Sequence, residues 1–284
     1  MNDNSILADV RQFIIWRNRF RKFTDYPPAI IPFIKKRLYY NWIADSYLKF
    51  YQDVKFLNYD QTIDALIKGN KSFVRFGDDV FDMIQGIGLY FNSWRQKYDP
   101  RLAERLKEVL ASSYPKLLVG FNPELILLTK EEFRQKGISE QYQYWTNSKI
   151  LLKNYLNQGQ VYGSALCFQE RYNQNFNHKK LQNHLKSRHL IIVTSNTGRF
   201  NNANLGSTTD YVEGPSSDAW FAYDLILARV REIASRYTKE KVLVLGALGP
   251  ATKIMAYDLS REGYTVWDTG QLFDLALGKL TNNT

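Results

Sequence analysis

The chain has 284 residues, of which 44% are hydrophobic and 23% charged; this composition is that of a globular protein and excludes an intrinsically disordered chain. Its single cysteine excludes an internal disulfide, and no apolar run approaches the roughly 18 to 20 residues of a membrane-spanning helix. The formal net charge of +10 indicates an anionic partner, such as nucleic acid, acidic lipid headgroups or a phosphorylated substrate. Because the N-terminus lacks a signal-peptide pattern, we expect a cytoplasmic protein.

Residues 1–58 are rich in basic and aromatic side chains and are predicted to form a helical extension. The first 50 residues contain nine Lys or Arg and only four Asp or Glu. Basic residues interleaved with aromatic ones suit a helix lying on an anionic membrane surface. Residues 1–50 are therefore predicted to contact the inner face of the plasma membrane peripherally. The alternative is a helical arm that packs on the core with its charges in solvent.

From residue 59 onward the pattern alternates between strand-like and helix-like segments. It predicts one α/β domain over residues 59–284, with a Rossmann-like, mostly parallel sheet flanked by helices. A stretch rich in Asn, Gly, Ser and Thr, residues 195–217, is predicted to be a long functional loop. The predicted strands are 72–76, 116–120, 164–168 and 190–194, and the predicted helices are 63–67, 80–90, 103–110, 131–160 and 219–237.

The stretch from Lys241 to Asp268 predicts a complete strand, glycine turn, helix and second strand. Its first strand is a continuous apolar run, and Gly246 and Gly249 allow backbone to approach a ligand closely. Asp268 lies 22 residues after Gly246, a spacing at which an acid commonly binds a ribose hydroxyl while the helix N-terminus faces a diphosphate. The alternative is an ordinary tight turn between a strand and a helix.

Two adjacent acids follow the first predicted strand, where open α/β sheets collect ligand groups. Asp78 and Asp79 come after Arg75 and Gly77, and their carboxylates suit a bound hydroxyl or a hard cation such as Mg²⁺ or Mn²⁺ held together with substrate phosphates. A helix cap is the alternative reading, but it accounts for only one of the two acids.

These motifs, in this order, resemble the GT-D glycosyltransferases, a bacterial family first catalogued as a domain of unknown function and associated with surface-glycan and adhesin glycosylation. The resemblance runs from about Asp60 to Leu275 and excludes the N-terminal extension. The matching segments are Arg75 to Val80, Glu170-Arg171-Tyr172, Ile191 to Arg199, Pro215 to Leu227 and Leu248 to Gly270.

The resemblance implies a hexosyltransferase that moves a sugar from a nucleotide donor, usually a UDP-sugar, to a glycan, lipid-linked or glycoprotein acceptor. It also implies a divalent metal, Mn²⁺ or Mg²⁺, at a D-x-E motif. This chain departs from the pattern, because Val80 replaces the glutamate and Gln271 replaces a later histidine. Three explanations stay open: Asp79 or Asp82 supplies the missing carboxylate, cationic side chains replace the metal, or the chain is inactive.

The sequence and the resemblance together give a set of candidate site residues. Asp78 and Asp79 are the candidate bases and tentative metal ligands, and Arg75 is a candidate catalytic cation. Arginine or lysine can neutralise the leaving diphosphate where a metal does not. The candidate donor-binding residues are Gly77, Arg171, Arg199, Asp218, Gly246, Gly249, Lys253 and Asp268.

Other features favour structural roles. Cys167 lies in an apolar run and is predicted to be a buried thiol, and the three histidines, His178, His184 and His189, lack metal-ligand spacing and are predicted to lie on the solvated surface. Two other functions remain as alternatives: a Rossmann methyltransferase, suggested by the glycine turn, and a basic binding module without enzymatic activity. Nucleic acid is not expected as the partner if the resemblance holds.

Overall fold

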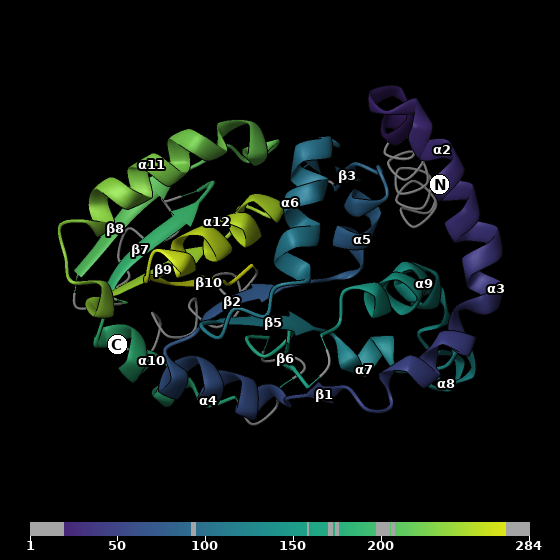
Figure 1. Ribbon diagram of the computed structural model, residues 1–284, viewed down its shortest axis with the longest axis horizontal. Helices are drawn as coiled ribbons and strands as arrows, with labels where there is room; N and C mark the ends of the chain where they lie inside the picture. Colours follow the sequence, from purple (N-terminus) through teal and green to yellow (C-terminus); the bar gives the residue numbers. More distant parts are fainter. Residues whose placement is uncertain are drawn as a thin grey trace, which may run out of the picture.

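The fold is built on a twisted sheet of eight parallel strands (Figure 1). The computed structural model describes residues 20–91, 95–157, 159–169, 173, 176–196, 205 and 208–270. Every strand pair in the sheet is parallel. In sheet order the strands are β1 (Lys55–Phe56), β6 (Val161–Ser164), β5 (Leu117–Phe121), β2 (Ser72–Arg75), β10 (Thr265–Asp268), β9 (Val242–Gly246), β7 (His189–Thr194) and β8 (Thr208–Glu213). The predicted Rossmann-like architecture is confirmed.

Helices cover both faces of this sheet, so alternate strand residues enter two separate cores. Ile191 and Val244 face one core with α6, α11 and α12, whereas Ile192 and Leu243 face the other with α4 and α10. Strands buried on both faces are apolar along most of their length, which is why the sequence predicted β7 and β9 as strands. The helices are α4 (Tyr59–Gly69), α5 (Asp78–Ile84), α6 (Pro100–Leu110), α7 (Pro123–Ile126), α8 (Lys130–Gln135), α9 (Tyr142–Leu151), α10 (His178–Lys186), α11 (Tyr223–Ala234) and α12 (Pro250–Arg261).

Strand order reverses at the centre of the sheet. From β2 the chain proceeds to β5 and β6 on one side, while β7, β9 and β10 return from the other side until β10 pairs with β2. Trp267 of β10 is aligned with Phe73 of β2. Such a reversal leaves a crevice at the carboxyl ends of the two central strands, because their connections run in opposite directions.

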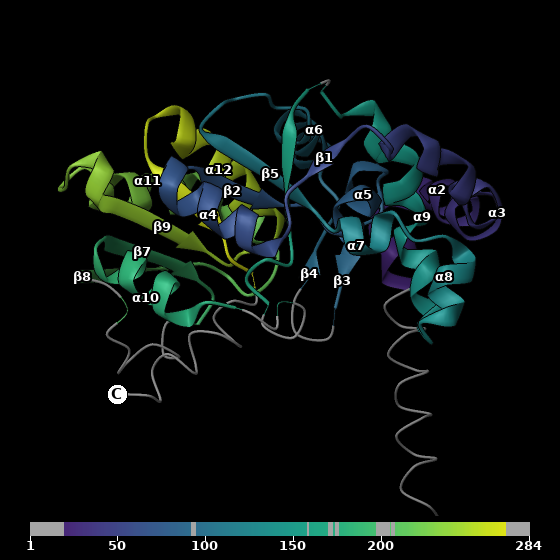
Figure 2. The same ribbon diagram turned by 90° about the horizontal axis from the view of Figure 1, so that it is seen from below.

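The described part of the N-terminal extension is a run of short helices packed beside α9 and α5, at the opposite end of the molecule from β8 (Figures 1 and 2). Tyr40, Ala44 and Tyr51 from this run are buried in the same core as α5 and α9. The following strand, β1, pairs with β6, so the sheet begins inside the segment predicted as an extension. The helices are η1 (Pro27–Ala29), α2 (Ile30–Lys35), η2 (Lys36–Tyr40), α3 (Asn41–Ile43) and η3 (Ala44–Tyr51).

Four predicted elements differ from the structure. The strand predicted at 164–168 is β6, which ends at Ser164, and the predicted loop 195–217 contains β8. The predicted helix 80–90 ends at Ile84 and is followed by an antiparallel hairpin of β3 (Leu89–Tyr90) and β4 (Arg95–Gln96). The predicted helix 131–160 is divided into α8 and α9. Among the described residues, no helix is long and apolar enough to cross a membrane.

Candidate active site

A cleft of about 520 Å³ lies at the carboxyl ends of the central strands. Its lining includes residues within two positions of the ends of six strands: β2, β5, β6, β7, β9 and β10. The β3–β4 hairpin contributes Arg95 and Gln96, and the segment after β8 contributes residues 215–217. The cleft therefore occupies the crevice that the reversal of strand order creates, and it joins motifs that are far apart in the sequence.

Two carboxylates form one wall. Asp78 and Asp79 are the first residues of α5, which begins after β2 with Gly77 as its cap, and both line the cleft. Burial raises the pKa of Asp78 to about 7; repulsion from Asp79 and Asp82 adds to this rise and Lys36 opposes it. Burial also raises the pKa of Asp79, against attraction from Lys253. The Asp78 carboxyl can therefore exchange a proton near neutral pH.

Two cations and one acid form a second cluster in the cleft. Lys253 Nζ, near the start of α12, donates to Asp268 Oδ2 over 3.0 Å, and the Arg75 guanidinium lies 3.6 Å from the other oxygen of Asp268. Arg75 also donates from its backbone N–H to Asp268 over 3.3 Å. Asp268 is 2% exposed, so its charge is compensated by these partners and not by water. The cluster keeps a net positive charge beside the acids.

Three of the glycines in the C-terminal motif have different roles. Gly249 lines the cleft and has φ +60°, and Gly270, with φ +49°, passes so close to Arg75 that any side chain there would overlap the guanidinium. Gly246 does not line the cleft. A Cβ at Gly246 would overlap the Thr252 side chain and lie 3.1 Å from Met255, so this glycine lets α12 pack closely on β9.

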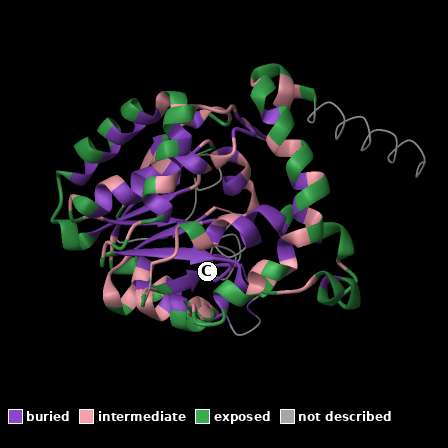
Figure 3. Cartoon of the chain, turned by 45° about the vertical axis from the view of Figure 1, so that its right-hand side comes forward, coloured by how far each residue is buried: buried purple, intermediate pink, exposed green. Residues whose placement is uncertain are grey.

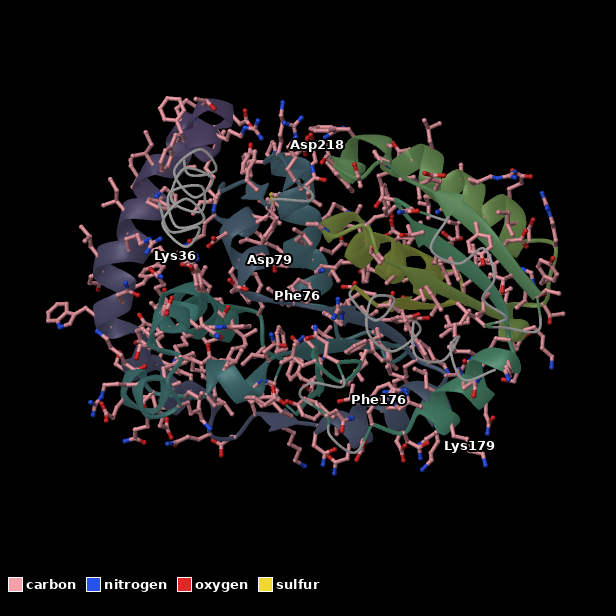
Figure 4. All side chains as sticks on the ribbon, turned by 180° about the vertical axis from the view of Figure 1, so that it is seen from behind. Lys36, Phe76, Asp79, Phe176, Lys179 and Asp218 are labelled. Atoms are coloured by element: carbon pink, nitrogen blue, oxygen red, sulfur yellow. The ribbon has the colours of Figure 1, made fainter. Side chains whose placement is uncertain are left out.

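Asp218 joins two walls of the cleft. It has φ +56°, and its carboxylate accepts hydrogen bonds from Arg95 Nε over 2.9 Å and from the Lys97 backbone N–H over 2.7 Å. Its own N–H donates to the Arg95 carbonyl oxygen over 2.7 Å. Asp218, predicted to bind donor hydroxyls, thus ties the β3–β4 hairpin to the segment that precedes α11 (Figure 4 labels Asp218 and Asp79).

The acids near the cleft do not reproduce the D-x-E metal site that the resemblance implies. Val80 is fully buried in the core, and the Asp82 carboxylate accepts from Lys36 and Asn147, each over 2.6 Å. Asp82 does not line the cleft. Within the described ranges, no group of three or more His, Cys, Asp or Glu side chains could hold a metal ion. Of the three acids that line the cleft, Asp268 is paired with Lys253 and Arg75, whereas Asp78 and Asp79 have no cationic partner within 4 Å among the described residues.

Most of the candidate residues that can be placed meet in this cleft. The candidates that line it are Arg75, Gly77, Asp78, Asp79, Gly249, Lys253 and Asp268. Asp218 and Gly246 do not line it. Arg171, Arg199 and Gln271 lie outside the described residues. Sequence reasoning missed the residues that tertiary pairing brings to the cleft, since no local pattern marks them. They are Phe91, Arg95, Gln96, Asn122, Gln169 and Thr194.

Two histidine predictions are wrong. The His184 ring stacks on Trp267 with centroids 5.3 Å apart, and burial lowers its pKa to about 4. His189 is 4% exposed in β7, and its Nε2 lies 2.9 Å from Asp210 Oδ2. His189 is buried because helices cover both faces of β7, whereas His184, on α10, packs against Trp267 of β10. Cys167 is fully buried, as predicted, and burial raises its pKa.

Comparisons with known proteins agree with the fold and with the family resemblance. The chain is 28% identical over 241 residues to the probable glycosyl transferase Gly of Streptococcus gordonii, which covers 78% of this chain and 32% of that protein. It is 26% identical over 231 residues to glycosyltransferase GlyD of Streptococcus pneumoniae serotype 4, covering 75% and 26% of the two chains. The matches thus span about a third or less of these curated relatives.

Solved structures show the same fold. One is a domain of unknown function 1792 described as having a distinct glycosyltransferase fold, with a TM-score of 0.65, 22% identity and 82% of each chain covered. Another is described as a new glycosyltransferase from Streptococcus sanguinis, with a TM-score of 0.60, 24% identity and 77% and 82% coverage. The family model described as "Glycosyltransferase GT-D fold" matches residues 73–274, which include every described wall of the cleft. The chain therefore belongs to the GT-D family of glycosyltransferases.

Proposed function

We propose that this chain transfers a sugar from a nucleoside diphosphate sugar, with a UDP-sugar as the first donor to test, to a hydroxyl of a glycan, lipid-linked or glycoprotein acceptor. The observation that carries the proposal is the division of the cleft into an acidic wall, Asp78 and Asp79, and a cationic cluster, Arg75 and Lys253, at the switch point of the sheet. Membership of a glycosyltransferase family favours this function over a methyltransferase or a passive basic module.

The arrangement suits the charges that move during transfer. The acceptor oxygen attacks the anomeric carbon, its proton passes to the carboxylate of Asp78 or Asp79, and the electron pair of the broken C–O bond leaves with the diphosphate. The cationic cluster then stabilises the charge that develops on the leaving phosphate. We assign Gly249 and the start of α12 to the diphosphate, since both line the cleft.

The test is binding and hydrolysis of donors by the full chain. Calorimetric titration with UDP-glucose, UDP-galactose and UDP-N-acetylglucosamine should detect binding, and slow hydrolysis should release UDP. Loss of hydrolysis in Asp78→Asn, with UDP binding retained, would support the base assignment. Binding of S-adenosylmethionine or an oligonucleotide in place of every sugar nucleotide would contradict the proposal, and donor binding without any turnover would indicate an inactive member of the family.

We also propose that the enzyme works at an anionic membrane surface, through an apolar stripe on the N-terminal helices made of Ile31, Ile34, Leu38 and Trp42. Residues spaced three or four apart share one helix face, and Ile31, Leu38 and Trp42 are 74%, 71% and 84% exposed. Figure 3 shows this run of helices with much of its outer side exposed. Residues 26–44 contain no acid and three basic residues, of which Lys36 is buried in an ion pair with Asp82. Lys35 and Arg37 supply the positive charge that favours an acidic lipid surface.

Vesicle flotation tests this surface. The chain should bind vesicles of phosphatidylglycerol and phosphatidylcholine, and binding should fall at least about tenfold in Leu38→Ser/Trp42→Ser, because two large apolar groups no longer enter the interface. Leu225→Ser is the matched control, since Leu225 is 78% exposed on α11, away from the stripe. Equal loss in the control, or a stripe variant that changes only the oligomeric state in light scattering, would contradict the membrane proposal.

A further inference from the structure

We propose that Lys253 and Arg75 take the place of the divalent metal, so that this chain binds its nucleoside diphosphate donor without a metal ion. The inference rests on the proposed function and concerns how the same cleft neutralises the donor. It accounts for a departure of this chain from the pattern that its family resemblance implies, namely the valine at position 80.

Asp82 cannot supply the metal ligand that is missing at position 80. Val80 is fully buried and packs in the core. Asp82, two residues later, does not line the cleft, and its carboxylate accepts hydrogen bonds from Lys36, whose side chain is 8% exposed, and from Asn147. Figure 4 labels Lys36 on the N-terminal helices and Asp79 near the start of α5. Turning Asp82 toward the cleft would leave the Lys36 ammonium buried without a counterion, which is costly.

Lys253 already supplies a positive charge where a metal would act. Its Nζ lies 3.0 Å from Asp268, and it is also the strongest attraction felt by the Asp79 carboxylate. Its side chain is 8% exposed, so little water screens this charge. A divalent ion beside Asp79 would be repelled by this fixed cation, whereas a diphosphate would be attracted to it.

One hydrogen-bond donor of Arg75, its Nε–H, has no partner among the described residues. Its Nη1 donates to the Ala165 carbonyl oxygen over 3.3 Å and its Nη2 lies near Asp268, but its buried Nε has no hydrogen-bond partner among the described residues. A buried donor without a partner is costly unless a ligand completes it. The Gly270 backbone lies so close to Arg75 that a Cβ there would overlap the guanidinium. Arg75 therefore lines the cleft with one N–H that has no hydrogen-bond partner among the described residues.

The test measures UDP affinity by calorimetry, once with EDTA and once with Mn²⁺. Wild-type affinity should agree within about twofold between the two solutions. Lys253→Met should weaken UDP binding about tenfold to a hundredfold, as expected for a lost charge-assisted hydrogen bond, while Lys253→Arg should retain most of it. Lys241→Met, which removes an exposed lysine outside the cleft, is the control for net charge. The electron paramagnetic resonance spectrum of Mn²⁺ should stay that of the free ion when the protein is added.

The wild-type comparison decides the question even if Lys253→Met fails to fold in a circular dichroism melt. A tenfold or larger loss of UDP affinity in EDTA, restored by Mn²⁺, would overturn the metal-free inference and leave the proposed function intact. Unchanged affinity in a folded Lys253→Met protein would also overturn it. Absence of UDP binding in both solutions, with absence of ADP and GDP binding, would overturn the proposed function as well.

Discussion

Asp78, the proposed base, lies in an environment that destabilises its ionised form. A carboxyl group whose pKa is raised on folding, here to about 7, binds its proton more tightly in the folded chain than in the unfolded one. The free energy of unfolding therefore falls as pH rises from about 4 to about 7, because ionising the Asp78 carboxyl costs more in the folded chain than in the unfolded one. A base must be ionised to work, so this strain accompanies function at neutral pH.

Replacing Asp78 by Asn should separate these two effects. We expect kcat/KM to fall about a hundredfold to ten-thousandfold, and the wild-type rate to decline below pH 7 as the base is protonated. The same variant should be more stable than wild type by on the order of 1–2 kcal/mol at pH 8, with the gain disappearing near pH 4. Thermal melts and rates across this pH range provide the measurement. A variant destabilised equally at both pH values would show that the Asp78 environment is not the one described.

Glycines 246 and 249 were predicted together, yet only Gly249 reaches the cleft. Gly246→Ala should lower the free energy of unfolding by about 1–3 kcal/mol, because its methyl group would overlap Thr252, while UDP affinity of the folded protein stays unchanged. Gly249→Ala should weaken UDP binding as well, since φ +60° and ψ −136° suit only glycine. Melting and calorimetry on both variants check this. Weaker UDP binding in folded Gly246→Ala would return Gly246 to the donor site.

At the scale of elements, the sequence predicted those parts that a local pattern determines. The strand, glycine turn and helix from Val242 to Arg261 were recognisable because an apolar run, a glycine and a helical stripe are adjacent in the chain. Strand β8 was missed, since only Val212 is buried in it and an edge strand need not be apolar. Strand β6 was displaced because the turn after it, not the strand, contains the apolar run.

The site shows the same division. Asp78, Asp79, Arg75 and Lys253 lie in motifs and were predicted, whereas the link between Asp218 and the β3–β4 hairpin joins residues 123 positions apart. Nothing near Asp218 in the sequence indicates Arg95 as its partner, so the sequence could not predict this contact. Contacts between distant segments depend on the packed sheet and are not encoded in either segment alone.

The hairpin contact can be tested against the donor-binding prediction for Asp218. In Asp218→Ala, the Lys97 amide loses its acceptor and should exchange hydrogen faster, by about tenfold if the bond contributes roughly 1.4 kcal/mol. UDP-glucose affinity should change less than about threefold, because both carboxylate oxygens of Asp218 already accept protein donors. Asp224→Ala, an exposed acid on α11, is the control. Unchanged exchange at Lys97 together with a large loss of donor affinity would favour the donor-hydroxyl role.

At the scale of the molecule, the N-terminal helices are both a surface and a part of the core. Their outer side carries the apolar stripe, whereas their inner side places Tyr40 and Tyr51 in the core with α9. Tyr51 also donates its hydroxyl hydrogen to the Lys149 carbonyl oxygen over 2.5 Å, and Asp45 lies 3.2 Å from the fully buried Lys149 ammonium. The proposed membrane-binding surface and helix α5 of the candidate active site are thus connected through one hydrophobic core.

Removing residues 1–51 should therefore unfold the chain, and should not simply release a soluble catalytic domain. The loss of Asp45 leaves Lys149 buried without its carboxylate, and the loss of Tyr40 and Tyr51 exposes the side of α9 that they cover. We expect the shortened chain to lack a cooperative thermal transition, and Lys149→Met within it to recover part of the helical signal in circular dichroism. A shortened chain that melts within about 3 °C of the full chain and binds UDP equally well would show that residues 1–51 are a separate appendage. The dependence on Asp45 and Tyr51 is also why point variants of the stripe, which leave the inner side intact, are the proper test of membrane binding.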